Sequence, residues 1–221
     1  MPAAISREIS RHWNEYIVVR GDSVFCSLDD QIHLDEFPSL YRSFLWRKMN
    51  DTGRDTLKLE ARGAALMKSA RPCERAAARF AADVVQWEDD GRKDTPNWPN
   101  AEAGLIRAFP RVAESLRRGD IAAAYDAVWR TKGARHRYGT KMLQMLAPGR
   151  AVGYDSVFAS ALPYWFRRGY VALCEDCGAV AVALNQRGIR NESRKNGEWH
   201  AADAGSVLYN HFYWKRWGQK R

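Results

Sequence analysis

The stretch from Tyr138 to Asp155 constrains the fold of this chain more than any other. Gly139 leads into Lys141, and a segment with apolar residues at helical spacing follows. The helix predicted there has to stop at Pro148-Gly149, because proline cannot continue a helix and glycine favours a helix end. A short apolar run then leads to Asp155, a residue type that caps helix starts. The sequence therefore predicts a glycine turn before the lysine, and an amine and a carboxylate that each lie at a helix N-terminus.

Most of the remaining chain carries apolar residues at the three- and four-residue spacing of helices. Residues 171–184 fit either a helix or a strand, and the first 50 residues mix short apolar runs with turns. The predominant prediction is an all-α fold. The predicted helices cover residues 39–49, 54–70, 73–87, 100–119 with a kink or an end at Pro110, 120–133 and 140–147.

A polar loop with two prolines, residues 88–99, indicates either a boundary between two lobes or an exposed insertion. Residues 1–95 form the predicted N-terminal helical lobe, which the aromatic and basic C-terminal tail can complete. Residues 96–221 form the second predicted lobe. A chain of 221 residues is long enough for one large core or for such a pair of lobes.

The chain is strongly basic, with a formal net charge of +9 at pH 7. This balance favours a polyanionic partner, most often nucleic acid, and the alternative is a basic protein without such a partner. No run of 18 apolar residues predicts a transmembrane helix, and the N-terminus lacks the apolar core of a signal peptide. We therefore expect a soluble protein of the cytoplasm.

Four cysteines are too few and too scattered for a disulfide framework in a chain of this length. Cys174 and Cys177 form a single CxxC pair, and a structural zinc site would need two more ligands. Cys26 and Cys73 are isolated in the sequence. We expect free thiols, no bound metal and no cofactor.

Lys141 and Asp155 together have a chemical interpretation. The positive end of a helix dipole disfavours an ammonium, so a lysine in the first turn of a helix loses its proton more easily. A neutral amine can attack an electrophilic carbon and form a Schiff base, and an anchored carboxylate can stabilise an oxocarbenium ion. Such a pair suits attack at the anomeric carbon of a sugar. The alternative is that Asp155 is only a helix cap and Lys141 only a solvated surface residue.

The same stretch resembles the helix-hairpin-helix DNA glycosylases, in particular the small bacterial type of 8-oxoguanine DNA glycosylase-like proteins. Gly139-Thr140-Lys141 matches the hairpin end that carries the catalytic lysine in that family. Pro148, Ala151-Val152 and Asp155 match the loop and the catalytic aspartate that follow. The resemblance implies two helical lobes with a cleft between them. It also implies that Lys141 is the nucleophile or lyase residue and that Asp155 stabilises the transition state and acts as general base.

The chain departs from the family pattern at several positions. Arg137 stands where the hairpin usually has another glycine, and Val157 stands where a histidine is common. The two predicted catalytic residues are 14 positions apart (155 − 141), which is closer than in the eukaryotic-type enzymes. The local run of four cysteines that holds an iron–sulfur cluster in some relatives is missing.

The resemblance also implies DNA contacts and a pocket for the extruded base. The alternative for each basic residue is solvated surface charge, and for each apolar residue it is packing in the core. The predicted DNA-binding residues are Arg135, His136, Arg137, Gly139, Thr140, Arg167 and Arg168. The predicted base-pocket residues are Met145, Phe158 and Trp165.

From this resemblance we expect a monomeric DNA glycosylase that binds double-stranded DNA in the nucleoid region. It would flip out and excise a damaged or modified base in DNA repair or in defence against phage DNA, with AP-lyase activity through Lys141. Two alternatives remain open: a helix-hairpin-helix module that binds DNA without catalysis, and a basic helical protein that binds another protein.

Overall fold

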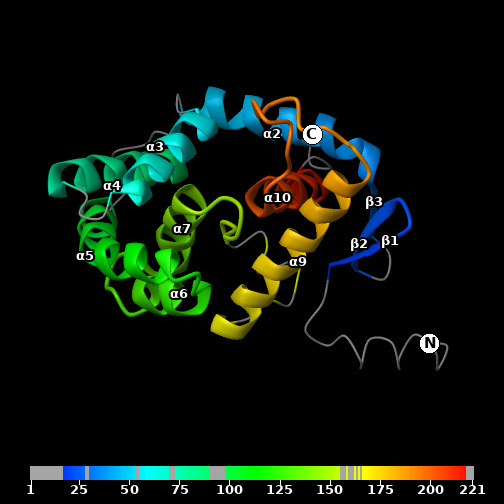
Figure 1. Ribbon diagram of the computed structural model, residues 1–221. Coiled ribbons are helices and arrows are strands. Elements are labelled where there is room, and N and C mark those ends of the chain that lie inside the picture. Colours follow the sequence, from blue (N-terminus) through cyan, green and yellow to red (C-terminus); the bar gives the residue numbers. More distant parts are fainter. Residues whose placement is uncertain are drawn as a thin grey trace.

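The computed structural model describes residues 17–27, 30–52, 55–69, 73–89, 98–154, 158, 162, 164 and 166–217. This part of the chain is predominantly helical, with one small antiparallel sheet near its start (Figure 1). The strands are β1 (Val18–Arg20), β2 (Ser23–Ser27) and β3 (Asp30–His33). The helices follow in the order η1 (Leu34–Glu36), α2 (Phe37–Thr52), α3 (Thr56–Lys68), α4 (Glu74–Glu88), α5 (Trp98–Arg117), α6 (Ile121–Trp129), the π-helical η2 (Arg135–Gly139), α7 (Thr140–Leu146), α9 (Phe166–Gln186) and α10 (Ala201–Trp217).

The sheet is the feature that the all-α prediction missed. β2 pairs with both other strands in antiparallel register, so that Val24 lies opposite Val19 on one side and Ile32 on the other. Val24 and Ile32 are fully buried. Gly21 forms the turn between β1 and β2 with a φ of 54°, a conformation that favours glycine. Strands of three to five residues are too short to show a clear alternating pattern, so the sequence did not predict them.

The predicted helices are present, with changes at their ends. Asp120 accepts a hydrogen bond from the backbone N–H of Ala123 at 2.8 Å, which confirms its predicted role as the cap of α6. α5 continues through Pro110, so this proline does not end the helix. Residues 171–184 lie inside α9, which resolves the choice between helix and strand in favour of helix.

The predicted lobe boundary at residues 95–96 lies outside the described residues. The division of the chain into two lobes stays a prediction. Among the described residues, no helix is both long and apolar enough to cross a lipid bilayer.

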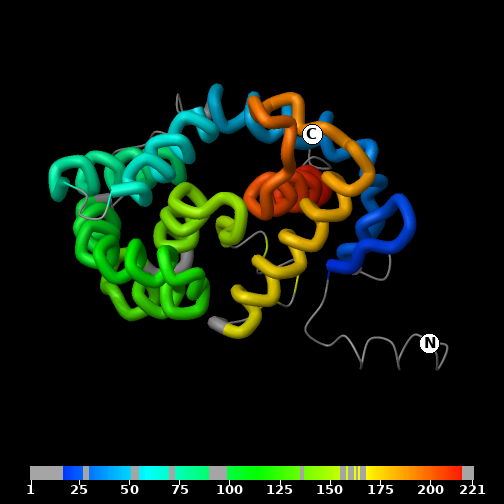
Figure 2. Tube along the Cα trace, viewed as in Figure 1, coloured from blue at the N-terminus to red at the C-terminus, as the bar shows by residue number. Residues whose placement is uncertain are grey.

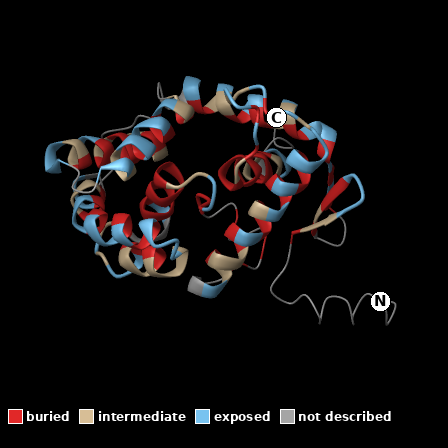
Figure 3. Cartoon of the chain, viewed as in Figure 1, coloured by how far each residue is buried: buried red, intermediate tan, exposed pale blue. Residues whose placement is uncertain are grey.

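α7 lies on the inner side of the arc of helices formed by α3, α4, α5 and α6 and contacts all four (Figure 1). All seven of its residues are buried, and Figure 3 shows it entirely in the colour of buried residues while the outer helices carry exposed stripes. α10, near the C-terminus, packs against α9 and against α2 from the first quarter of the chain (Figure 2). The structure therefore buries the short central helix within segments that are distant in sequence.

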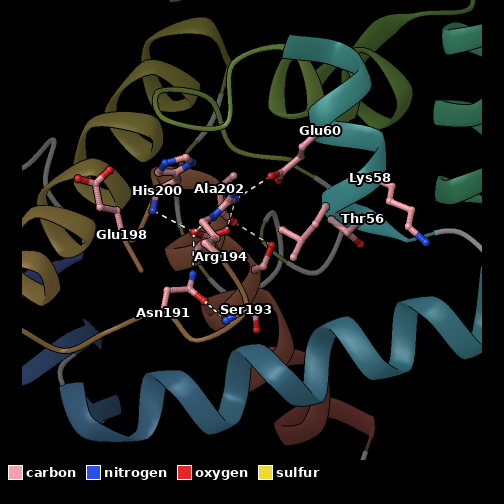
Figure 4. A network of polar contacts seen from close by, with 12 residues as sticks. Thr56, Lys58, Glu60, Asn191, Ser193, Arg194, Glu198, His200 and Ala202 are labelled. Atoms are coloured by element: carbon pink, nitrogen blue, oxygen red, sulfur yellow. Dashed lines mark hydrogen bonds and ion pairs between the residues drawn. The ribbon is translucent and has the colours of Figure 1, made fainter. Parts of the chain in front are cut away.

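A buried ionic cluster joins α3, the loop after α9 and the start of α10 (Figure 4). The guanidinium of Arg194 donates two hydrogen bonds of 2.6 Å to Asp203 and one of 2.6 Å to Glu60. Asn191 and the backbone N–H of His200 also donate to Asp203, at 3.1 and 2.9 Å. Two buried carboxylates therefore share one guanidinium.

This cluster predicts a pH dependence of stability. Burial raises the pKa of Glu60 from 4.5 to about 8, and the charge of Asp203 adds to the effect, although Arg194 opposes it. The folded protein then holds a proton on Glu60 that the unfolded chain has released, so the unfolding free energy falls as pH rises from about 4.5 to about 8. In Glu60→Gln the loss of unfolding free energy across this pH range is expected to be smaller by up to roughly a few kcal/mol. Urea unfolding of both proteins across this range measures it, and parallel curves would contradict it.

Candidate functional site

The connection after α7 folds back onto the start of that helix. The hydroxyl of Thr140, the first residue of α7, accepts a hydrogen bond from the backbone N–H of Tyr154 at 2.9 Å and donates one to its carbonyl at 3.0 Å. Gly153 lies against the lysine itself, since a Cβ at Gly153 would be 2.6 Å from Cδ and 3.0 Å from Nζ of Lys141. Asp155, the predicted partner of Lys141, lies outside the described residues. The backbone that leads into it is held beside Lys141.

Lys141 is enclosed by side chains from α4 and α10. Its side chain is only 6% exposed, and Nζ lies 3.8 Å from a carboxylate oxygen of Glu88. The same nitrogen is 5.9 Å from the ring centroid of Trp87 and 5.5 Å from that of Tyr209. These distances suit cation–π attraction. The alternative interpretation of Lys141 as a solvated surface lysine is therefore wrong.

Two neighbouring acids at the end of α4 connect this helix to η2 and α7. Glu88 accepts a hydrogen bond of 3.0 Å from Nε of Arg137. Asp89 accepts hydrogen bonds of 3.0 Å at both oxygens from the hydroxyl of Tyr138 and lies 2.9 Å from Nη2 of Arg137. Partial burial acts to lower the pKa of Arg137, but Glu88 and Asp89 outweigh it and raise that pKa. Burial, helped by Asp89, raises the pKa of Tyr138 to about 12, so its hydroxyl stays protonated and donates.

Gly139 is required by close packing and not by a turn. Its φ is −62°, an ordinary helical value, and η2 runs directly into α7. A Cβ at this position would lie 2.5 Å from Cβ of Val128 on α6. The turn after α6 uses Gly133 instead, with a φ of 92°. The sequence prediction of a glycine turn immediately before the lysine is thus corrected: the glycine allows α6 and the start of α7 to approach each other.

The predicted DNA-binding residues differ in their exposure and in the partners that the structure shows for them. The Gly139 N–H donates to the carbonyl of Ala134 at 3.0 Å, and the buried Thr140 hydroxyl is engaged by Tyr154. Arg137 is half-exposed and paired with Glu88 and Asp89. Arg168 is exposed. Side chains of the other three, Arg135, His136 and Arg167, lie outside what the structure describes.

The predicted base-pocket residues that the structure describes lie in packed surroundings. Met145 is fully buried, and its backbone carbonyl approaches Gly63 of α3 so closely that a Cβ at Gly63 would overlap it. Phe158 is also buried and stacks on Tyr154 with ring centroids 6.3 Å apart. Trp165 lies outside the described residues. A role in a base pocket stays a prediction for all three.

Several neighbours of Lys141 were not predicted from the sequence. They are Trp87 and Glu88 from α4 and Tyr209 from α10. Lys48 contacts the same tryptophan, with Nζ 4.3 Å from the Trp87 ring centroid and a hydrogen bond of 3.1 Å to the Trp87 carbonyl. One signal was present: acidic residues at the end of a helix face the negative end of its dipole and need cationic partners. Nothing in the sequence indicated which cations these would be.

The four cysteines all lie in the described part of the chain. All four are free, and Cys174 and Cys177 are buried within α9. Burial raises the pKa of the Cys174 thiol to about 12, which keeps it protonated. Within the described ranges, no group of three or more His, Cys, Asp or Glu side chains is placed to hold a metal ion.

A surface cavity of about 440 Å³ lies away from the predicted site, between the start of α6, the loop after α7 and α9. None of its lining residues belongs to the predicted site. They are Gly119, Asp120, Ile121, Ala122, Gly149, Arg150, Val171, Cys174, Glu175 and Gly178.

Comparisons of the chain with protein-family models, with curated proteins and with solved structures gave no match.

Proposed function

We propose that this protein is a DNA glycosylase that excises a damaged or modified base, with Lys141 as the nucleophile and Asp155 as the stabiliser of the transition state. The observation that carries the proposal is the double hydrogen bond between Thr140 and Tyr154. It ties the residue before Asp155 to the residue before Lys141, so the two backbone segments that lead into the proposed catalytic residues lie side by side. The resemblance of Gly139-Thr140-Lys141 to a glycosylase hairpin supports the same function.

The enclosed position of Lys141 suits covalent catalysis. As a neutral amine it attacks C1′ of the deoxyribose while the bond from C1′ to the base nitrogen breaks, and the bond electrons leave with the base. The carboxylate of Asp155 would stabilise the positive charge that develops on the sugar. The bond from C1′ to O4′ then breaks, and O4′ takes up a proton from the lysine nitrogen, which leaves a Schiff base between Lys141 and C1′. This Schiff base allows elimination of the 3′ phosphate, which is AP-lyase activity.

The net charge of +9 supports double-stranded DNA as the partner, because cationic side chains replace counterions along the phosphates. Extruding a nucleotide costs a few kcal/mol of stacking, and damaged or modified bases are the easier ones to extrude. Repair of cellular DNA and attack on modified phage DNA both use this chemistry.

A panel of duplexes tests the proposal. Duplexes that each contain one damaged or phage-type modified base are incubated with the protein, and released bases are identified by mass spectrometry. We expect release of at least one base, and a covalent protein–DNA adduct with that substrate in the presence of borohydride. Tight, salt-sensitive DNA binding with no released base across the panel would overturn the proposal.

One observation favours a non-catalytic DNA-binding module as the second candidate. The ion pair of Lys141 with Glu88 gives the amine a structural partner, and Arg137 and Tyr138 of the same segment bind the same acidic pair. In this alternative the segment stabilises the fold and the basic surface binds DNA. The same panel separates the two candidates, because the module binds DNA and releases no base.

A further inference from the structure

The end of α4 carries two carboxylates where the helix dipole disfavours them. Glu88 is the last residue of α4 and Asp89 is its C-cap, and no basic residue of the helix itself lies in its last turn. The side chains are nearly or fully buried, with 9% and 0% exposure. Such a placement requires cationic or hydrogen-bonding partners from elsewhere, and η2 and the start of α7 supply them.

The two acids differ in their partners. Asp89 is held by the hydroxyl of Tyr138 and by Arg137, which anchors the two segments to each other. Glu88 has one oxygen on Nε of Arg137 at 3.0 Å and the other 3.8 Å from Nζ of Lys141. The guanidinium therefore orients the Glu88 carboxylate, with its second oxygen toward the amine.

Among the described residues, the other groups around Lys141 and the Trp87 ring are weaker proton acceptors than Glu88. Lys48 of α2 lies on the Trp87 ring and is itself an amine bound to the Trp87 carbonyl. Tyr209 of α10 presents its ring to the amine. The amide oxygen of Gln144, on the next turn of α7, is close to Gly153 and to the lysine. Of these neighbours, Glu88 alone is a carboxylate.

We propose that Glu88 is the general base that accepts a proton from Lys141, which deepens the proposed function and rests on it. The ammonium of Lys141 transfers one proton to the Glu88 carboxylate and becomes a neutral amine. Its lone pair forms the bond to C1′ while the bond to the base breaks, leaving the base as an anion. The base then takes the proton from the Glu88 carboxylic acid, which restores the carboxylate.

The first test follows the proton on Lys141 without DNA. The protein is labelled with ¹³C at the lysine ε carbon, and the Lys141 signal is assigned by its loss in Lys141→Gln. Because an adjacent carboxylate favours the ammonium, Glu88→Gln is expected to lower the titration midpoint of this signal by about one pH unit or more. Asp89→Asn, the neighbouring acid on the same anchor, is expected to change it by less than half as much. Equal midpoints in the wild type and Glu88→Gln would overturn the proposal.

The second test measures formation of the borohydride-trapped adduct in single-turnover experiments. Glu88→Gln is expected to slow it by about 10²–10⁴-fold at neutral pH and to make the rate rise with pH, because solvent must then take the proton. Asp89→Asn is expected to stay within about tenfold of the wild type, since it changes the anchor alone. Equal losses in both variants, with unaltered pH profiles, would show that Glu88 only holds the fold and would overturn its role as a base.

The two proposals fail in different ways. A wild-type protein that releases no base and forms no adduct overturns the glycosylase proposal, and with it any catalytic role of Glu88. A Lys141 midpoint that Glu88→Gln does not move overturns the proton transfer, even where the wild type excises a base.

Discussion

Lys141→Gln is expected to abolish the borohydride-trapped adduct and to reduce base release by at least about 1,000-fold, or about 4 kcal/mol in the barrier. Glutamine has nearly the length of lysine and can donate to Glu88, but it has no amine that can attack C1′. Binding of substrate duplex should change little, because the side chain of Lys141 is buried and contributes little to phosphate contacts. The measurements are gel analysis of trapped adducts and mass spectrometry of released base, beside DNA binding at several salt concentrations.

Lys48→Gln is the matched control for this variant. Lys48 is the other buried amine on the Trp87 ring, so Lys48→Gln removes the same charge beside the same ring. We expect the adduct to form with Lys48→Gln and not with Lys141→Gln. An undiminished adduct with Lys141→Gln would show that another amine is the nucleophile.

Asp155→Asn is expected to lower the rate of base release by roughly 10²–10³-fold, because the developing charge on the sugar is no longer stabilised.

Arg194→Gln is expected to cause the largest loss of stability. Arg194 is the cation that holds the carboxylates of Glu60 and Asp203, and both are buried. Removing one partner of a buried ion pair costs about 3–5 kcal/mol, because the remaining charge is left without compensation. In a chain of this size that corresponds to a fall in melting temperature of roughly 6–20 °C. The loss should be larger at pH 8 than at pH 5.5, because the raised pKa of Glu60 leaves it protonated and uncharged at the lower pH.

The control for Arg194→Gln is Arg42→Gln. Arg42 also forms an ion pair with the loop after α9, with Glu192 at 2.6 Å, but both side chains of this pair are exposed. Exposed pairs contribute about 0–1 kcal/mol, so the melting temperature should fall by no more than a few degrees. Similar losses in the two variants would show that burial of the cluster adds nothing to its contribution.

The helices were largely predictable because their signals are local. Apolar spacing and caps such as Asp120 depend on residues within a few positions of each other, and these signals placed most of the helices. The sheet was missed because pairing between short strands is decided by partners and not by the strand alone. The local sequence also left residues 171–184 open between helix and strand. In the structure they belong to α9, which packs against α10 and α6.

The sequence by itself determined the position of Lys141 in the first turn of a helix, the short connection to Asp155 and the basic character of the chain. Only the tertiary structure decided that Lys141 is enclosed and that Glu88 lies beside it. Glu88 precedes Lys141 by more than fifty positions, and the side-chain hydroxyl of Thr140 holds Tyr154, 14 positions further along (154 − 140), beside the start of α7. Contacts of this kind follow from how helices pack, and local sequence patterns carry no record of that packing.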